Sequence, residues 1–182
     1  MISTHIINLI NESNKILINR LRVEVYAFNQ DQTKILAHLR SSSKLPKLPA
    51  GGVNINETLI DAAKREMMEE SGWTGINFKQ IKIPGNWKLN ISQKEQLQYF
   101  SNWENKSNIQ SETNFCVVCE VDQFKPTNAF KTSNDSDNFE LYDIDLIYNL
   151  TKKSISKNNR IEFHKQFRLT CFNYLKDNYD FF

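Results

Sequence analysis

The sequence predicts an α/β (α+β) fold in which helices pack against a mixed β-sheet. Apolar and polar side chains alternate from Leu21 to Ala27, as they do in a half-buried strand. Residues 59–71 instead carry apolar side chains at helical spacing. Strands come first along the chain, followed by a helix, further strands and a last helix. This order is typical of a sheet covered by helices.

The same periodicities predict the other elements. Residues 4–18 form an imperfect amphipathic pattern, which predicts a helix in an N-terminal extension covering 1–20. Thr58 and Asp61 predict a capped helix start, and Gly72 is placed to end that helix in a left-handed conformation. No clear period is visible over 86–114. The remaining predictions are strands at 34–39, 76–83 and 114–121, a strand turning into a helix over 141–150, and a helix over 161–176 within a C-terminal region of 158–182.

Length and charge favour one ordinary globular domain spanning 1–182. The 23 Lys and Arg residues against 21 Asp and Glu residues give a net charge of +2, which does not indicate nucleic-acid binding. No apolar run is long enough to span a membrane and no targeting segment is visible. We therefore expect a cytoplasmic protein without a membrane partner.

The three cysteines do not suggest a disulfide framework or a zinc site. Cys116 and Cys119 lie three apart in a predicted strand, so their side chains point to opposite faces. No second pair of ligands completes a zinc site. We expect Cys116, Cys119 and Cys171 to be core residues.

The chemically informative stretch is an acidic helix that follows a glycine pair. Glu66, Glu69 and Glu70 stand at positions i, i+3 and i+4, so their carboxylates share one helix face. Like charges at this spacing repel each other, whereas a bound divalent cation would make the cluster favourable. The alternative, a solvated acidic face, does not explain the neighbouring glycines and Arg65.

Residues 51–73 resemble the Nudix box, G-x5-E-x7-R-E-U-x-E-E-x-G-U, where U is a bulky apolar residue. Every fixed position matches: Gly51, Glu57, Arg65, Glu66, Glu69, Glu70 and Gly72, with Met67 and Trp73 at the apolar positions. The resemblance implies a Nudix fold, an α/β/α sandwich around a mixed sheet in which the box forms a loop-helix-loop. It also implies hydrolysis of a nucleoside diphosphate linked to another group.

The resemblance also assigns roles within the box. Glu66 and Glu70 are expected to be the main Mg²⁺ ligands, with Mn²⁺ as a possible substitute and the carbonyl of Ala50 as a backbone ligand. Glu69 is expected to be a further ligand or the proton acceptor for water. Glu57 is expected to be an auxiliary group nearby, and Arg65 is expected to orient a glutamate. The glycine pair, Gly51 and Gly52, lets the backbone approach the metal or a substrate phosphate.

Two expectations concern residues outside the box. Many members of the family have another acidic residue in a later loop, and Glu140 is our candidate here, with Asp137 as the alternative. Arg40 or Lys44 is placed to contact a substrate phosphate. Surface positions are the competing interpretation for each of these side chains.

The substrate is left open among nucleotide sugars, nucleoside triphosphates and dinucleotides. Residues 88–90, Lys-Leu-Asn, match neither the proline of ADP-ribose hydrolases nor the tyrosine of dinucleoside-polyphosphate hydrolases. A basic C-terminal part keeps an RNA 5′-end pyrophosphohydrolase or decapping enzyme as an alternative. A second alternative is a nucleotide-binding regulator with a Nudix fold but no hydrolysis. A homodimer is also possible.

Overall fold

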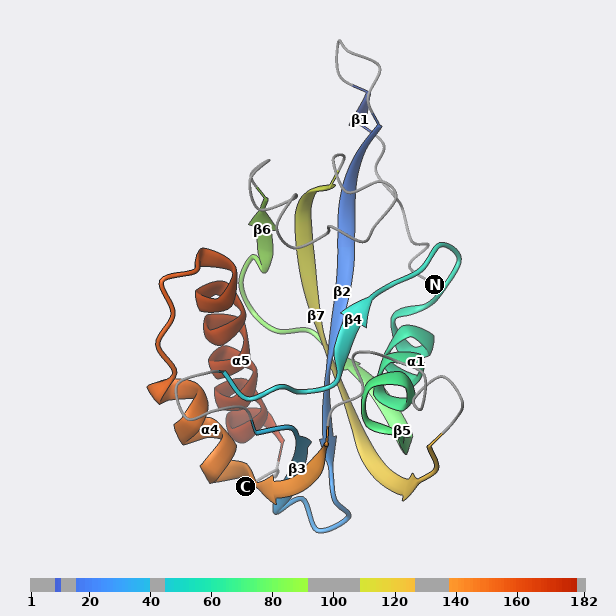
Figure 1. Cartoon of the computed structure of the whole chain (residues 1–182), viewed down its shortest axis with the longest axis vertical. Helices are drawn as coiled ribbons and strands as arrows, with labels where there is room; N and C mark the ends of the chain where they lie inside the picture. The colour runs from blue at the N-terminus through green and yellow to red at the C-terminus, as the bar shows by residue number, and fades with distance from the viewer. Residues whose placement is uncertain (1–8, 11–15, 40–44, 92–108, 127–137, 180–182) are drawn as a thin grey trace.

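The computed structural model describes residues 9–10, 16–39, 45–91, 109–126 and 138–179. Figure 1 shows the arrangement of its helices and strands. The strands are β1 (Leu9–Ile10), β2 (Ile16–Phe28), β3 (Lys34–Ala37), β4 (Ala50–Gly52), β5 (Trp73–Ile81), β6 (Lys88–Asn90), β7 (Ile109–Phe124) and β8 (Glu140–Asp143). The helices are α1 (Leu59–Ser71), α4 (Ile144–Lys153) and α5 (Asn159–Asn178).

The strands form one mixed sheet centred on two long strands, β2 and β7. These two are parallel, and every other pairing is antiparallel. The order across the sheet is β5-β7-β2-β3-β8, while β1 and β4 pair with β2 and β6 pairs with β7. Strand β4 therefore pairs with the central strand β2, and it contains the first residues of the box, Gly51 and Gly52.

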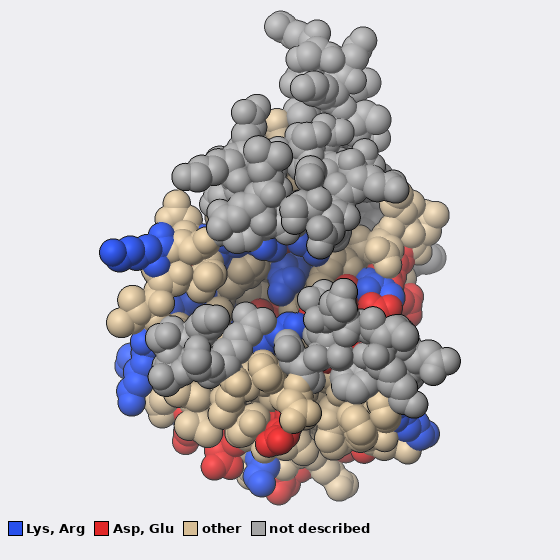
Figure 2. All heavy atoms as spheres, in the orientation of Figure 1, with Lys and Arg blue, Asp and Glu red and all other residues tan. Residues whose placement is uncertain are grey.

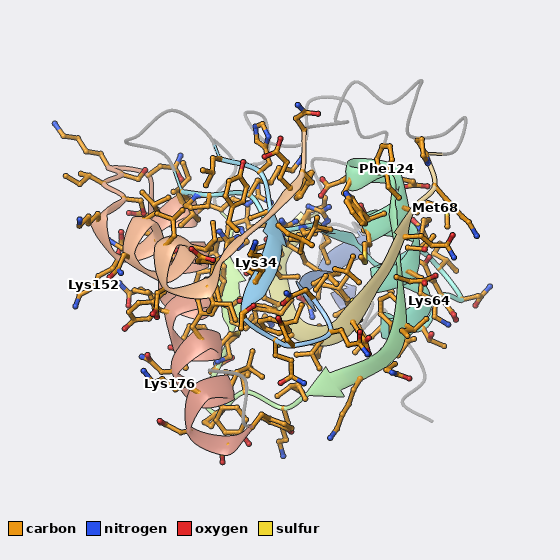
Figure 3. The ribbon with its side chains drawn as sticks, turned by 90° about the horizontal axis from the view of Figure 1, so that it is seen from below. Lys34, Lys64, Met68, Phe124, Lys152 and Lys176 are labelled. Carbon is orange, nitrogen blue, oxygen red and sulfur yellow. The ribbon has the colours of Figure 1, made fainter. Side chains whose placement is uncertain are left out.

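Helices cover both faces of the sheet. Helix α1 packs Ala62, Ala63 and Met67 on one face, against residues such as Val25 of β2. Helices α4 and α5 cover the other face, where Phe172 of α5 meets Tyr26 of β2 edge-on at 5.4 Å between ring centroids. The end-on view in Figure 3 shows the sheet between these two layers, as in an α/β/α sandwich.

Most predicted elements are confirmed, with changed boundaries. Helix α1 spans the predicted 59–71, and its cap residues Thr58 and Gly72 adopt the expected conformations. The strand predicted at 114–121 begins earlier, at Ile109, and the one predicted at 76–83 begins at Trp73. The three cysteines are buried, and Cys116 and Cys119 belong to core clusters on opposite faces of the sheet.

The predicted N-terminal helix over 4–18 is wrong where the structure describes that segment. Leu9–Ile10 and Ile16–Leu17 are paired antiparallel strands, and Ile18 pairs with Ile109 of β7. The described apolar residues of this segment, Leu9, Ile10 and Ile16–Ile18, therefore extend the sheet. Pairing with β7 overrides a weak helical period, since tertiary contacts routinely outweigh local propensity.

A buried ion pair ties α5 to the central strand. Glu24 of β2 is 1% exposed and its carboxylate accepts hydrogen bonds from Nε and Nη2 of Arg168, at 2.9 and 2.7 Å. Burial by itself raises the pKa of Glu24, but the charge and hydrogen bonds of Arg168 outweigh it and lower this pKa to about 2. Arg168 also donates to the carbonyl of Pro46, so one side chain joins α5, β2 and the segment leading to the box.

Candidate active site

Helix α1 directs the glutamates of the box toward the outer edge of β4. The side chain of Thr58 accepts from the N–H of Asp61, which begins the helix, and Gly72 ends it at a φ of 72°. Because Ala63 and Met67 occupy the face against the sheet, Glu66 and Glu70 lie on the neighbouring side of the helix, where they meet β4. The capped ends and the buried stripe therefore set where the carboxylates gather.

Strand β4 turns backbone groups toward these glutamates. The carbonyl of Pro49 and the N–H of Val53 hydrogen-bond to β2. In an antiparallel ladder alternate residues face the partner strand, so Ala50 and Gly52 direct their N–H and C=O groups the other way. The N–H of Ala50 accordingly donates to Oε2 of Glu70 at 2.9 Å. The carbonyl of Ala50 points to the same side, where a bound cation would need it.

Arg65 organises the cluster through five hydrogen bonds. Its guanidinium holds Glu57 with two of them, at 2.8 and 2.9 Å, and donates to the carbonyl of Gly52 at 2.7 Å. It also donates to Glu66 at 2.6 Å and to Glu69 at 3.2 Å. The hydrogen bonds from Arg65 are the main cause that lowers the pKa of Glu57. The predicted role of Arg65, orienting a glutamate, agrees with this geometry.

Gly51 makes room for the Glu66 carboxylate. A Cβ atom on residue 51 would lie 1.9 Å from Cδ of Glu66 and 2.0 Å from its Oε1, far inside van der Waals contact. The glycine is therefore required by a close approach between side chain and backbone. Burial raises the pKa of Glu66 even though Arg65 bonds to its carboxylate, so the charged form is costly in this position.

Glu70 sits deeper and faces a lysine outside the box. Lys47 Nζ lies 3.0 Å from Oε1 of Glu70 and 5.9 Å from the ring centroid of Phe139. Burial is the main cause that raises the pKa of Glu70 to about 6, with Lys47 and the N–H of Ala50 opposing it. A carboxylate that resists ionisation in this way gains from a nearby divalent cation.

The donor set fits Mg²⁺ or Mn²⁺. Carboxylates and a backbone carbonyl are hard oxygen ligands, and Glu66 is already held against Gly51. Within the described residues, no three His, Cys, Asp or Glu side chains converge as a metal cage. Arg65 and Lys47 instead hold individual carboxylates by ion pairs. A bound cation would neutralise the glutamate charges that Arg65 and Lys47 now neutralise.

Glu140 does not join the cluster. Its carboxylate accepts a hydrogen bond from the hydroxyl of Tyr142 at 3.2 Å, and both side chains lie on the face of β8 toward α4 and α5. The box glutamates belong to α1, on the other face. Phe139, one residue earlier, is the residue that approaches the site, through Lys47. The candidates Arg40, Lys44 and Asp137 lie outside the described residues.

Two basic residues near the cluster were not among the candidates that the sequence indicated. Lys47 contacts Glu70, and Arg22 of β2 pairs across from Gly52 of β4. The sequence does contain one indication of such residues. Arg22 and Glu24 are charged residues that alternate with apolar ones in a predicted strand. Figure 2 shows Lys and Arg side chains gathered in a hollow at the centre of this face, between α5 and α1.

Comparison with known families decides the assignment. The profile of the NUDIX domain matches residues 18–161, which is most of the chain and includes β2, β4, α1 and β7. The chain belongs to the NUDIX domain family. The fold is the Nudix fold, and residues 51–73 are its Nudix box.

One solved structure of similar fold supports the fold assignment. An ADP compounds hydrolase has 13% identity and a TM-score of 0.56, over 91% of this chain and 78% of that chain. A NUDIX hydrolase from Nitrosomonas europaea has 18% identity and a TM-score of 0.49, over 82% of this chain and 88% of that chain. No curated protein sequence matches the chain.

Replacing Gly51 with Ala in the Nudix box is expected to lower kcat/KM by roughly ten- to a hundredfold. The new methyl group displaces the Glu66 carboxylate, and a shift of about 1 Å in a catalytic group has effects of this order. Gly52→Ala is the matched control, because its Cβ would meet only the flexible end of Arg20, at 3.0 Å. Equal losses in the two variants, measured as initial rates, would contradict the close-approach argument.

Arg65→Lys is expected to weaken the metal response by about tenfold. Lysine keeps the charge but cannot bond both oxygens of Glu57 while reaching Gly52 and Glu66. Loss of a group that orients ligands typically costs about 10–100-fold in metal affinity or activity. The measurement is the Mg²⁺ concentration that gives half-maximal rate. An unchanged midpoint would show that Arg65 does not position the glutamates.

Proposed function

We propose that this protein is a divalent-metal-dependent hydrolase that cleaves a pyrophosphate bond in a nucleoside diphosphate linked to another group. The observation that carries the proposal is the glutamate cluster at the outer edge of β4. Arg65 orients it, Gly51 admits Glu66, and the backbone of Ala50 contacts Glu70. Family membership supports the reaction class.

Glu66, Glu70 and the carbonyl of Ala50 would hold Mg²⁺ or Mn²⁺, with Glu69 as a further ligand or proton acceptor. When bound, the metal neutralises phosphate charge and makes a water molecule more acidic. Glu69 is the best placed of the three glutamates to accept that proton, because its side chain is 39% exposed against 13% for Glu66 and 12% for Glu70. The two buried carboxylates serve better as ligands.

The segment beside β4 supplies the positive charge that a diphosphate needs. Lys47 lies at Glu70, and release of that ion pair on metal binding would free its ammonium group for a phosphate oxygen. The ADP compounds hydrolase of similar fold is compatible with a nucleoside diphosphate substrate.

The structure gives little support to RNA as the substrate. Three basic residues of the C-terminal part form contacts within the protein. Arg168 is buried on Glu24, Arg160 bonds to Glu112, and Lys165 donates to the carbonyl of Ser154. A small nucleotide derivative is therefore the better candidate.

Phosphate release from a substrate panel tests the proposal. The panel contains nucleoside triphosphates, ADP-ribose, other nucleotide sugars, dinucleoside polyphosphates, NADH, coenzyme A and capped RNA, each with Mg²⁺, with Mn²⁺ and with chelator. We expect turnover of a small nucleotide derivative with either metal and none with chelator. Folded protein that hydrolyses no member under any metal would contradict the proposal and favour a binding module.

A further inference from the structure

A cavity lies on the face of the sheet that α5 covers. It has a volume of about 520 Å³, within the usual range for small-molecule sites. Its walls come from β2, the segment 45–48, the connection before α5, and α5 itself. Lys47 lines this cavity and also contacts Glu70, so the cavity adjoins the metal-binding glutamates.

Arginine side chains gather at this cavity. Arg22 and Arg168 line it. Arg20 and Arg160 bond to Glu112, whose carboxylate also lies 3.3 Å from His164 at the cavity wall. Burying uncompensated charge is costly, and a bound anion would remove that cost.

Arg22 is the arginine without a carboxylate partner. Glu24 is taken by Arg168, and Glu112 is bonded by Arg20 at 2.9 Å and by Arg160 at 3.0 Å. Among the residues that the structure describes, no side chain forms an ion pair with Arg22, and its buried Nε has no hydrogen-bond partner. Because Arg22 lines the cavity, its guanidinium is available to a ligand there.

The position of Arg22 links the cavity to the reaction. It stands opposite Gly52 in the pairing of β2 with β4, one strand from the cluster. Lys47, which also lines the cavity, lies 3.0 Å from Glu70. One extended substrate can therefore place its diphosphate at the glutamates and a second group at Arg22.

We propose that this cavity is an anion subsite in which Arg22 binds a phosphate monoester of the substrate, apart from the diphosphate that is cleaved. Arginine suits this role because its fork-shaped donors bond two oxygens of one phosphate. The inference rests on the proposed function and narrows its substrate class to nucleotide derivatives with an additional phosphate on a ribose or on the linked group.

Matched ligand pairs test the subsite without turnover. The pairs are NADPH and NADH, coenzyme A and dephospho-coenzyme A, and ADP-ribose with and without a 2′-phosphate. Calorimetric titration with chelator present measures binding of each member. We expect the phosphorylated member of at least one pair to bind about tenfold more tightly, as a charge-assisted bidentate contact predicts. Equal affinities in every pair, or no binding of either member, would overturn the inference.

Variants assign the preference to Arg22. Arg22→Gln should abolish it, Arg22→Lys should retain part of it, and thermal unfolding checks that each variant is folded. Lys152→Gln is the matched control, because Lys152 points outward from α4, away from the sheet (Figure 3). A preference that survives in Arg22→Gln would overturn the assignment. Should Arg22→Gln not fold, an undiminished preference in Arg22→Lys would overturn it instead.

The turnover panel separates this inference from the proposed function. Metal-dependent hydrolysis without a phosphate preference would refute the subsite and leave the hydrolase. A preference that Arg22→Gln removes, in a protein without turnover, would establish the subsite and refute the hydrolase.

Discussion

Replacing Glu70 with Gln is expected to lower kcat by about a thousandfold and leave the fold intact. The substitution keeps the volume and the hydrogen bond from the N–H of Ala50, but removes the charge that a divalent cation requires. Metal stabilisation of a phosphoryl reaction contributes several kcal/mol, which corresponds to a factor of this order. Steady-state rates at saturating Mg²⁺ and thermal unfolding midpoints measure the two parts of the prediction.

Asp61→Asn on the same helix is the control for that experiment. Asp61 is exposed and serves the helix start with Thr58, so its replacement removes a negative charge from α1 without touching the cluster. We expect nearly full activity from this variant. A Glu70→Gln protein with the same rate as the control would show that Glu70 is not a metal ligand.

Replacing Glu24 with Gln is expected to destabilise the protein by about 3–5 kcal/mol near neutral pH. Arg168 would remain buried without its counter-charge, and broken buried pairs have costs of this size. The pKa of Glu24 is about 2 in the folded protein, against its usual value of 4.5. The stabilisation is therefore complete above about pH 4.5 and is lost as pH falls toward 2, when the folded carboxylate becomes protonated.

Urea unfolding at a series of pH values tests this prediction. The difference in free energy of unfolding between wild type and Glu24→Gln should shrink steadily below pH 4.5. Asp145→Asn on α4 is a suitable control, because Asp145 is exposed and its replacement uncovers no buried cation. A wild-type to Glu24→Gln difference that stays constant through the acid range would show that the pair does not carry the stabilisation.

Much of the fold could be predicted from hydrophobic periodicity and from the residues that cap helices. The start and end of α1 follow from Thr58, Asp61 and Gly72, because capping chemistry is local. The N-terminal segment was mispredicted because its apolar residues satisfy both a weak helical period and a strand pairing. The long-range partner β7 favours the strand, through pairs such as Ile18 with Ile109, and local sequence patterns do not contain this pairing.

The candidate site likewise contains residues whose placement the sequence predicts and residues whose placement it does not. The roles of Arg65 and the glutamates on α1 depend on spacing within one helix, which the sequence displays directly. Lys47 and Arg22 depend on how β4 and α5 pack against β2, and local patterns do not contain that information. The position of Glu140 also depends on a long-range pairing: in the register of β8 against β3 it lies opposite Ala37, so its side chain is on the face of the sheet that α4 and α5 cover.

Binding of Mn²⁺, followed by electron paramagnetic resonance, tests the central claim most directly. Free Mn²⁺ gives a strong signal that decreases when the ion binds to protein. We expect wild-type protein to take up Mn²⁺ saturably, Mg²⁺ to displace it, and Glu70→Gln to lose most of the binding. Wild-type protein that leaves the Mn²⁺ signal unchanged, or a Glu70→Gln variant that binds Mn²⁺ as well as wild type, would contradict a metal centre built on the Nudix box glutamates.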